Sequence, residues 1–498
     1  MTGDVCASAV ASGLCMSSVV GRTWIKPRSG RSWAGTAFVF PAVIHKLPVA
    51  LAIVALVSGA ARAESLPEAL VHAYQDNPQL NVERAKLRGT DENVPQALAG
   101  YRPQVTVGLS SGLIALRNLL PDSTSQSALL KPWTAGLTIN QTLFNGFKTS
   151  STVRQAEAQV RSGREELRSV EQGVLLDGAT AYMSVLSNQS LVEAQRVNLT
   201  FLKQTLDTTR TRLRVGDVPP TDVAQAEARV ARATADLNAA EVALAVSQAT
   251  YAEVIGTRPG RLVTAEPADR LVPRSRDEAM AIARRENPTV TGATFDLDVA
   301  QFGVSIAESG LYPTLGVQGN IQRQVQTDTT LGTTSTNQAS VMGTLNVPIY
   351  DGGVAASQVR QAKEGLSQAR NQLDRVRRQT ETATVAAWVT HEGAKIALTA
   401  AQAEVRATQV ALDGVQKEAQ AGKRTTLEVL NSQQDLMQAR ARLISAQQDR
   451  VVASYTLLSA IGRLDRVHLA LASPDYDPQT HYEQVRDAWH GLRTPSGK

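Results

Sequence analysis

Residues 143–157 read LFNGFKTSSTVRQAE, and residues 349–363 read IYDGGVAASQVRQAK. In both stretches an aromatic residue precedes a glycine turn, a run of small or polar residues follows, and VRQA comes next. The two stretches lie 206 positions apart. The chain thus contains two copies of a segment that leads from a turn into a helix, which indicates an internal duplication.

Further landmarks recur in the same order in both copies. Asn77-Pro78 returns as Asn287-Pro288 at an offset of 210 residues. Six glycines fix the later spacing: Gly146, Gly216 and Gly256 in the first copy, and Gly352, Gly422 and Gly462 in the second. Successive glycines are 70 and then 40 residues apart in both copies. We therefore divide the chain into a first repeat over 64–256 and a second over 276–462.

Within each repeat, an alternation of apolar and polar side chains predicts a pair of strands. In QVTVGLSSGL, for example, Val105, Val107 and Leu109 alternate with polar or small residues. The predicted strands cover 104–113 and 133–144 in the first repeat, and 314–325 and 339–350 in the second. The polar segments between them, around PDSTSQS and TDTTLGTTSTNQ, are interpreted as exposed loop tips.

After each glycine turn the pattern becomes helical. Each repeat predicts one long helix, over 148–214 and 354–420, of about 100 Å at ~1.5 Å per residue. Return helices are predicted over 221–256, opened by Thr221 or Asp222 as cap, and over 426–461. Frequent alanines favour a sheath of closely packed neighbouring helices, and a simple antiparallel coiled coil is the alternative.

The charge distribution separates the first 63 residues from the rest. They hold six basic residues and one acid, Asp4, so the remaining chain has 45 basic and 45 acidic residues. This balance argues against a nucleic-acid partner, which requires a net basic face. The apolar run LPVALAIVALVSGAARA, which ends in Ala61-Arg62-Ala63, predicts a secretory signal peptide with an upstream extension over 1–63. A transmembrane anchor is the alternative, but the run is short for a bilayer span.

The sequence offers no residues for catalysis or for a cofactor. Both cysteines, Cys6 and Cys15, lie in the leader. His391-Glu392 lacks the second histidine of a zinc-binding helix, so His391 is interpreted as a packing or surface residue. Neither a glycine-rich phosphate loop nor a nucleophile elbow is present. We therefore expect neither an enzyme nor a metal or cofactor site.

Export and strand length together favour a membrane protein. A tilted transmembrane strand needs ~9 to 11 residues, which matches the predicted strands, although soluble sandwiches also use such strands. Unpaired strand edges in lipid cost several kcal/mol per backbone group. Four strands are too few for a closed barrel, since even small barrels need about eight. The chain is therefore expected to pool its strands with other copies.

The ordered landmarks resemble the TolC family of outer-membrane channel tunnels. The resemblance rests on the twofold order of helix, strand pair, long helix, VG turn, T-D-V-x-x-A return helix and terminal L-x-x-I-G, over residues 64 to about 465. It implies a mainly α fold with a membrane β-barrel: a homotrimer with twelve strands in outer-membrane lipid and twelve helices in the periplasm. Residues 257–275 and the tail 463–498 would form an equatorial belt. The family has no catalytic activity.

The resemblance also assigns the functional residues. Family channels are closed at the far end of the tube and meet an adaptor protein there. Matched by position, Asp222 and its partner Arg424 would hold the entrance closed, with Thr221 beside Asp222. Glu428 and Asn431 would line the constriction, where the family has two acidic positions and this chain has Asn431 at the second. The adaptor-contacting tips would include Val215, Gly216 and Asp217 of the first repeat and Gly422 and Lys423 of the second. On the residues alone, Asp222 is equally a helix cap and Arg424 a solvated tip residue.

The function implied by the resemblance is passive conduction. An inner-membrane ABC transporter or proton-driven pump and a periplasmic adaptor would deliver cargo into the channel. Type I protein secretion is favoured over small-molecule efflux, because the predicted mature start lacks the lipid-anchor cysteine of many efflux relatives. A periplasmic coiled-coil adaptor or structural protein is the alternative in a different class.

Overall fold

A computed structural model of the chain describes residues 63–119, 125–328, 332–474 and 476–495. The predicted signal peptide and its extension lie almost wholly outside the described residues. The first repeat contains three short helices, α1 (Leu66–Asp76), α2 (Pro78–Asp91) and α3 (Asn93–Leu98), followed by strands β1 (Gln104–Ser111), β2 (Ile114–Leu119) and β3 (Ser125–Asn145). The long helix α4 (Lys148–Arg214) and the return helix α5 (Pro220–Ile255) complete it.

The second repeat follows the same order. Helices α6 (Arg276–Glu286) and α7 (Pro288–Glu308) precede strands β4 (Thr314–Asp328) and β5 (Gly332–Asn346). The long helix α8 (Val354–Gln420) and the return helix α9 (Thr426–Ile461) come next, and a short helix α10 (Pro478–Val485) lies in the tail. Two one-turn helices, at Ala99–Tyr101 and Ser309–Leu311, lead into the sheet at matching places.

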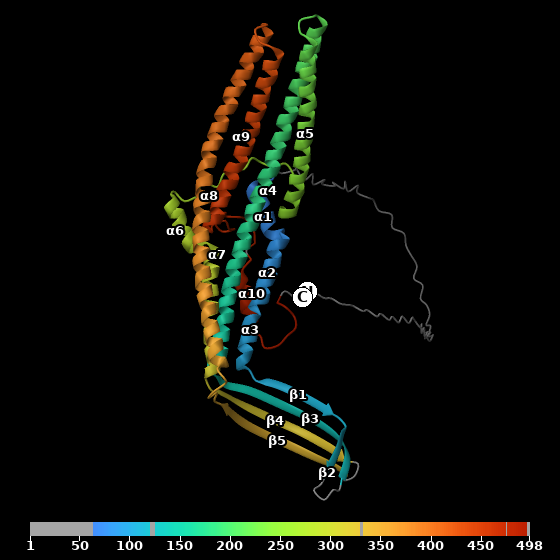
Figure 1. The fold of residues 1–498 in the computed structure, drawn as a ribbon, viewed down its shortest axis with the longest axis vertical. Coiled ribbons are helices and arrows are strands. Elements are labelled where there is room, and N and C mark those ends of the chain that lie inside the picture. The colour runs from blue at the N-terminus through green and yellow to red at the C-terminus, as the bar shows by residue number, and fades with distance from the viewer. Residues whose placement is uncertain (1–62, 120–124, 329–331, 475, 496–498) are drawn as a thin grey trace, which may run out of the picture. The chain divides into compact units, whose positions relative to one another are not determined.

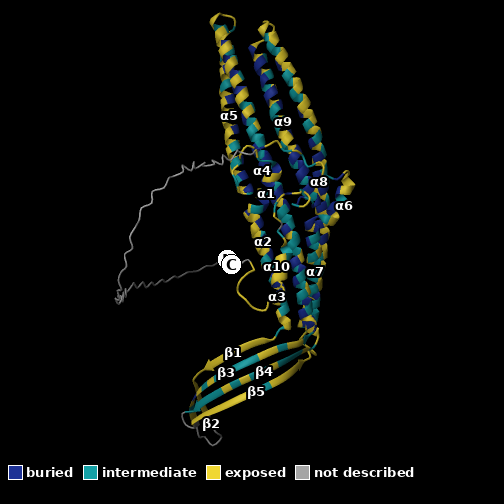
Figure 2. Ribbon diagram, turned by 180° about the vertical axis from the view of Figure 1, so that it is seen from behind, coloured by how far each residue is buried: buried dark blue, intermediate teal, exposed yellow. Residues whose placement is uncertain are grey.

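The long helices pair within each repeat, as Figure 1 shows for α4 with α5 and α8 with α9. Helices α4 and α8 have 67 residues each, so each extends about 100 Å at ~1.5 Å per residue. Small residues such as Ala226, Ala233 and Ala240 are buried along α5. Buried positions recur along these helices, while the rest of their surface is of intermediate burial or exposed (Figure 2).

The largest apolar core lies where α1, α4, α5 and α9 meet the segment between the repeats. Tyr182 of α4, Tyr251 of α5 and Leu458 of α9 are fully buried in it. Leu262, from the segment between the repeats, is also part of this cluster. The core therefore ties the two repeats together at the level of the predicted equatorial belt.

The Asn-Pro landmarks are helix corners. Asn77 caps α2, since its side-chain oxygen accepts from the backbone N–H of Gln79 at 2.9 Å, and its amide donates to the carbonyl of Val254 at 2.8 Å. Asn287 caps α7 in the same way, and its amide donates to the carbonyl of Ala460 at 2.9 Å. In each repeat one asparagine thus joins the corner to the end of the return helix.

The spacing glycines share a backbone conformation that other residues rarely adopt. All six have a positive φ: Gly146, Gly216, Gly256, Gly352, Gly422 and Gly462. At Gly462, which ends α9, an added Cβ would lie 2.6 Å from the Cα of Asn287. At Gly146, between β3 and α4, it would lie 2.7 Å from the carbonyl oxygen of Ser309. Glycine is required at both positions by its φ and by close packing.

The strands form one antiparallel sheet in the order β1-β3-β4-β5, and β2 pairs with β3 beyond the end of β1 (Figure 1). The sheet has two unlike faces. One row across the sheet aligns Val107, Leu137, Ile321 and Ala339, and the next row on the same face, two residues along each strand, aligns Val105, Ile139, Gly319 and Val341. Because paired residues share a face, one face is apolar. On the other face Thr138 donates to Asn320 at 3.3 Å, and Gln322 donates to Gln338 at 3.3 Å.

Several predicted strand boundaries are wrong. Strand β3 begins at Ser125, eight residues before the predicted 133, and β5 covers Thr- and Ser-rich residues that were interpreted as a loop. These residues suit a strand because β-branched threonine favours the extended backbone. The last predicted strand ran to 350, but β5 ends at Asn346. Pro348 has no N–H to donate to a ladder.

Candidate functional site at the helix tips

The two turns at the ends of the helix pairs have the same backbone. In the first, Asp217 N–H donates to the carbonyl of Arg212 at 3.0 Å, and in the second Lys423 N–H donates to the carbonyl of Glu418 at 2.9 Å. The predicted tip residues Val215, Gly216, Asp217, Gly422 and Lys423 are all exposed. Since β3 and β5 lead into the opposite ends of α4 and α8, these tips lie a full helix length from the sheet.

An ion pair joins each tip to its long helix, and the helix residue of the pair is basic in the first tip and acidic in the second. Arg212 Nε lies 2.7 Å from the carboxylate of Asp217 in the first tip. In the second tip the equivalent of Arg212 is Glu418, whose carboxylate lies 2.7 Å from Arg424 Nε. In each tip the ion pair thus reaches the last turn of the long helix, but the helix carries the positive charge in the first tip and the negative charge in the second.

Glu428 is held by local contacts at the start of α9. Its carboxylate accepts from the backbone N–H of Thr425 at 2.8 Å and from Arg424 at 2.7 Å, and Thr425 caps the helix in return. These hydrogen bonds, from the Thr425 backbone first and then from Arg424, hold the pKa of Glu428 below its usual value. Hydrogen bonds to Glu418 first, and then to Glu428, raise the pKa of Arg424. Glu428 therefore remains an anion at neutral pH.

The structure does not bring Asp222 and Arg424 together within one subunit. Among the described residues no ion pair joins them, because Arg424 is already paired with Glu418 and Glu428 of its own tip. The interpretation of Thr221 or Asp222 as the cap of α5 is also wrong. The helix begins at Pro220 with Pro219 at the cap position, so Asp222 lies in the first turn. A carboxylate there is stabilised by the helix dipole.

Asn431, which was predicted to line the constriction, forms a hydrogen bond with the first repeat. Its side-chain oxygen accepts from Arg229 of α5 at 3.0 Å, and Arg229 also donates to Gln434 of α9. Close by, Gln433 donates to Asn198 of α4 at 2.9 Å, and both of these side chains are buried. The two helix pairs are therefore joined by amides and one guanidinium near the tips.

A groove opens between the two pairs beside the tips. Its volume is about 570 Å³, and its walls include Thr205 and Thr209 of α4, Gln416 and Gln420 of α8, and Val429 of α9. Threonine and glutamine side chains offer hydrogen bonds without a fixed charge. The ion pair of Arg212 and Asp217 also lines the groove, so its walls combine polar, charged and apolar side chains.

Sequence reasoning missed Arg229, Asn198 and Gln433. Arg229 lies in an alanine-rich stretch with charges on several faces, so its contact with α9 leaves no periodic signal. Across the described part of the chain, no three or more His, Cys, Asp or Glu side chains cluster closely enough to bind a metal ion. Within the same residues, no helix has the length and apolar character of a bilayer span.

Comparison with known proteins gives the family. A profile of the family described as "Outer membrane efflux protein" matches residues 69–257 and 280–463. The chain is 39% identical over 445 residues to the outer membrane efflux protein BepC of Brucella suis, covering 89% of this chain and 95% of that protein. It is 27% identical over 323 residues to the outer membrane protein TolC of Vibrio cholerae, covering 64% and 72%.

Solved structures agree with this fold. The CmeC outer membrane channel of Campylobacter jejuni superposes with a TM-score of 0.72 at 13% identity, covering 85% of this chain and 89% of that one. The outer membrane protein VceC of Vibrio cholerae gives 0.66 at 17% identity, covering 80% and 96%. The matched profile covers well over half of the chain. The chain therefore belongs to the outer membrane efflux protein family, the TolC family of outer-membrane channels, and is a channel and not an enzyme.

Proposed function

We propose that three copies of this chain form a conduit that conducts cargo passively from an inner-membrane transporter and a periplasmic adaptor to the outside of the cell. The observation that carries the proposal is the two-faced sheet with open edges at β1 and β5. Val105, Val107 and Leu109 on its apolar face are 59–73% exposed in one subunit. Such a face is suited to lipid, and the hydrogen-bonded polar face is suited to a water-filled lumen.

Closure of the sheet supports the trimer. Strands β1 and β2 pair with successive parts of the same edge of β3, so together they occupy one strand position. One chain therefore provides four strand positions across the sheet. Unpaired backbone groups at the outer edges cost several kcal/mol each in lipid. If β5 of one copy pairs with β1 of the next, three copies form a closed barrel with twelve strand positions. The long helices of the three copies would then extend this barrel as a tube.

The tips are proposed as the gated entrance. Arg424 is paired with Glu418 and Glu428 of its own tip. We propose that a latch between Arg424 and Asp222 joins neighbouring copies, and that Arg424 then leaves Glu418 or Glu428 to pair with Asp222. The exposed turns and the polar groove beside them are proposed as the surface that receives the adaptor. Asp222→Asn and Arg424→Gln should each raise the closed-state current in a planar bilayer. Asp217→Asn, which breaks the pair with Arg212 in the other tip, is the matched control.

For cargo we propose type I protein secretion with an ATP-driven inner-membrane pump. Small-molecule efflux is the second candidate. It is favoured because BepC, the relative that is 39% identical to this chain, is named an outer membrane efflux protein. A deletion strain separates the two. Loss of specific secreted proteins with unchanged drug sensitivity supports protein secretion, and the reverse result supports efflux.

A further inference from the structure

The segment 257–275 between the repeats is fixed to α4 of the first repeat. The hydroxyl of the buried Tyr182 donates to the carbonyl of Val263 at 2.6 Å and accepts from the N–H of Val263 at 3.0 Å. Leu262, next to Val263, is buried in the core and forms a parallel bridge with Glu64. This half of the segment therefore cannot shift relative to α4 without losing these contacts.

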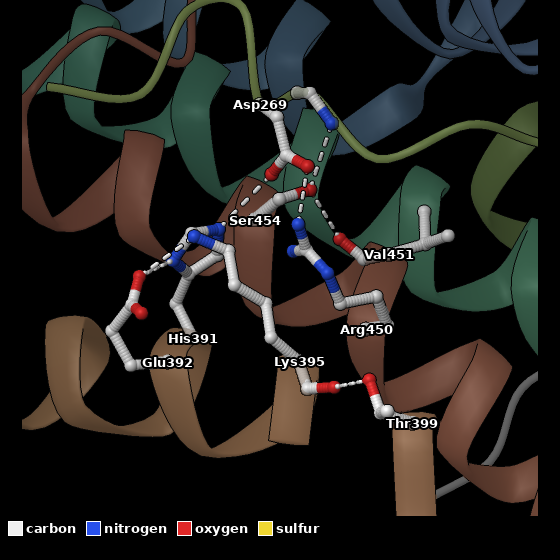
Figure 3. Close-up of polar contacts among 9 residues, drawn as sticks. Asp269, His391, Glu392, Lys395, Thr399, Arg450, Val451 and Ser454 are labelled. Carbon is white, nitrogen blue, oxygen red and sulfur yellow. Dashed lines mark hydrogen bonds and ion pairs between the residues drawn. The ribbon is translucent and has the colours of Figure 1, made fainter. Parts of the chain in front are cut away.

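Six residues later the same segment is fixed to the second helix pair (Figure 3). The carboxylate of Asp269 accepts from Arg450 of α9 and lies 3.1 Å from Nε2 of His391 on α8. Its neighbour Ala268 donates its backbone N–H to Ser454 of α9 at 3.0 Å. The side chains of His391 and Arg450 are 1% and 6% exposed, whereas that of Asp269 is 48% exposed.

Other charged groups around this cluster lie at its edge. The carboxylate of Glu392 is 3.4 Å from Nδ1 of His391, within ion-pair range but without hydrogen-bond geometry. Glu392 is itself paired with Lys395 at 2.7 Å. Asp269 is thus the residue of the segment that the buried side chains of His391 and Arg450 both contact, and it joins α8 to α9 as well as to the segment.

The first repeat has apolar side chains at the positions equivalent to His391 and Arg450. At the offset of 206 residues, His391 corresponds to Val185, which is fully buried, and Arg450 corresponds to Leu244, which packs against the core. Replacing a buried ionic cluster by apolar residues is often neutral or stabilising. The ionic cluster of the second repeat is therefore better explained by the fixed position that its directional hydrogen bonds impose.

We propose that Asp269, His391 and Arg450 form a clamp that holds the α8/α9 pair to the 257–275 segment, and that this clamp must loosen when the entrance opens. The inference rests on the proposed function. Arg450 lies 26 residues from Arg424, which is roughly 40 Å along the axis of α9. A small rotation of the α8/α9 pair about the clamp would therefore displace the tip by a much larger distance. Asp269 is a positioning residue, because it acts on the entrance through the helices.

The first test is the opening frequency of the full-length mature channel in planar bilayers. Asp269→Asn removes the charge shared by His391 and Arg450, so the opening frequency should rise on the order of tenfold with an unchanged open-channel conductance. Asp269→Glu, which retains the charge, should restore most of the wild-type behaviour. Glu266→Gln removes a charge from an exposed residue of the same segment and should change nothing. An unchanged opening frequency in Asp269→Asn overturns the proposal.

A double variant separates positioning from stability. His391→Val with Arg450→Leu copies the residues of the first repeat, so the chain should fold with at least wild-type heat stability and still open as often as Asp269→Asn. Lower heat stability with wild-type gating would show a structural role only and would overturn the clamp. Failure of the proposed function is distinct, because then the wild-type chain itself forms no pores.

Discussion

Arg229 of α5 donates from Nη2 to the side-chain oxygen of Asn431 on α9 at 3.0 Å, and so joins the two repeats within the first two turns of α9. The contact connects helices that come from different copies of the duplicated segment. It places a guanidinium between the two pairs close to the tips, which are the proposed entrance. A hydrogen bond between residues 202 positions apart thus joins the two repeats at this level.

Removing this contact should loosen the entrance. In Arg229→Ala the closed-state current should rise on the order of tenfold, because hydrogen bonds from a charged donor are among the stronger ones. Asn431→Asp should lower the current, since a carboxylate pairs more strongly with a guanidinium. Arg232→Ala is the matched control, because Arg232 pairs with Asp236 of its own helix, at 3.9 Å. Equal currents in all three variants would show that Arg229 does not hold the entrance.

Neutralising Glu428 should reduce cation preference. Three copies would place three of these carboxylates around the constriction, which favours cations. Glu428→Gln removes the charge but retains the capping box with Thr425, since glutamine also serves at that position. The reversal potential under a salt gradient should shift toward zero in the variant. Glu418→Gln removes the other partner of Arg424 and should shift it less. Unchanged selectivity in Glu428→Gln would exclude the ring.

Acid stability should depend on Glu286, at the end of α6. Hydrogen bonds from Arg463 first, and then from Arg285, lower the pKa of Glu286 from 4.5 to about 2. Because the folded-state pKa is below the unfolded one, its stabilising effect is complete above pH 4.5 and is lost as the pH falls from 4.5 to 2. Glu286→Gln should therefore lower the unfolding temperature at pH 7, and the difference from wild type should shrink across that window. A constant difference down to pH 2 would show that the pairing does not stabilise the fold.

Replacing Gly462, at the end of α9, should destabilise the fold more than replacing Gly422 at the second tip. Gly462→Ala adds a Cβ that would lie 2.6 Å from the Cα of Asn287, in addition to the cost of about 1 kcal/mol for a left-handed alanine. Gly422→Ala bears only that cost, because nothing lies within 4 Å of its added Cβ. Thermal unfolding should show a clearly larger loss of stability for Gly462→Ala. Equal losses would mean that the corner accommodates a methyl group.

Elements set by glycine, proline and long periodic runs could be predicted from the sequence. Gly146 and Gly216 enclose α4, and the predicted range 148–214 matches the observed helix. The strands were less predictable because β3 extends through Pro132, and because threonine-rich residues of β5 read as a loop. Local sequence gives no signal that polar residues will pair across a sheet.

The contacts of the site could not be predicted, because they join residues far apart in sequence. Asp269 and Arg450 are 181 residues apart, and Asn198 and Gln433 are 235 apart. His391 was interpreted as a packing or surface residue, and it is indeed buried, but its pairing with Asp269 appears only in the folded chain. Resemblance located the tips by position, and the contacts of Arg424 and Asn431 came from the structure alone.

The central claim is that one subunit cannot close its own sheet and must share its strands with other copies. The most direct measurement is the mass of the mature chain, purified from outer membranes in detergent, by light scattering with correction for bound detergent. The account predicts a particle of three chains that dissociates on heating and forms pores in planar bilayers. A monomer that remains soluble without detergent would contradict it.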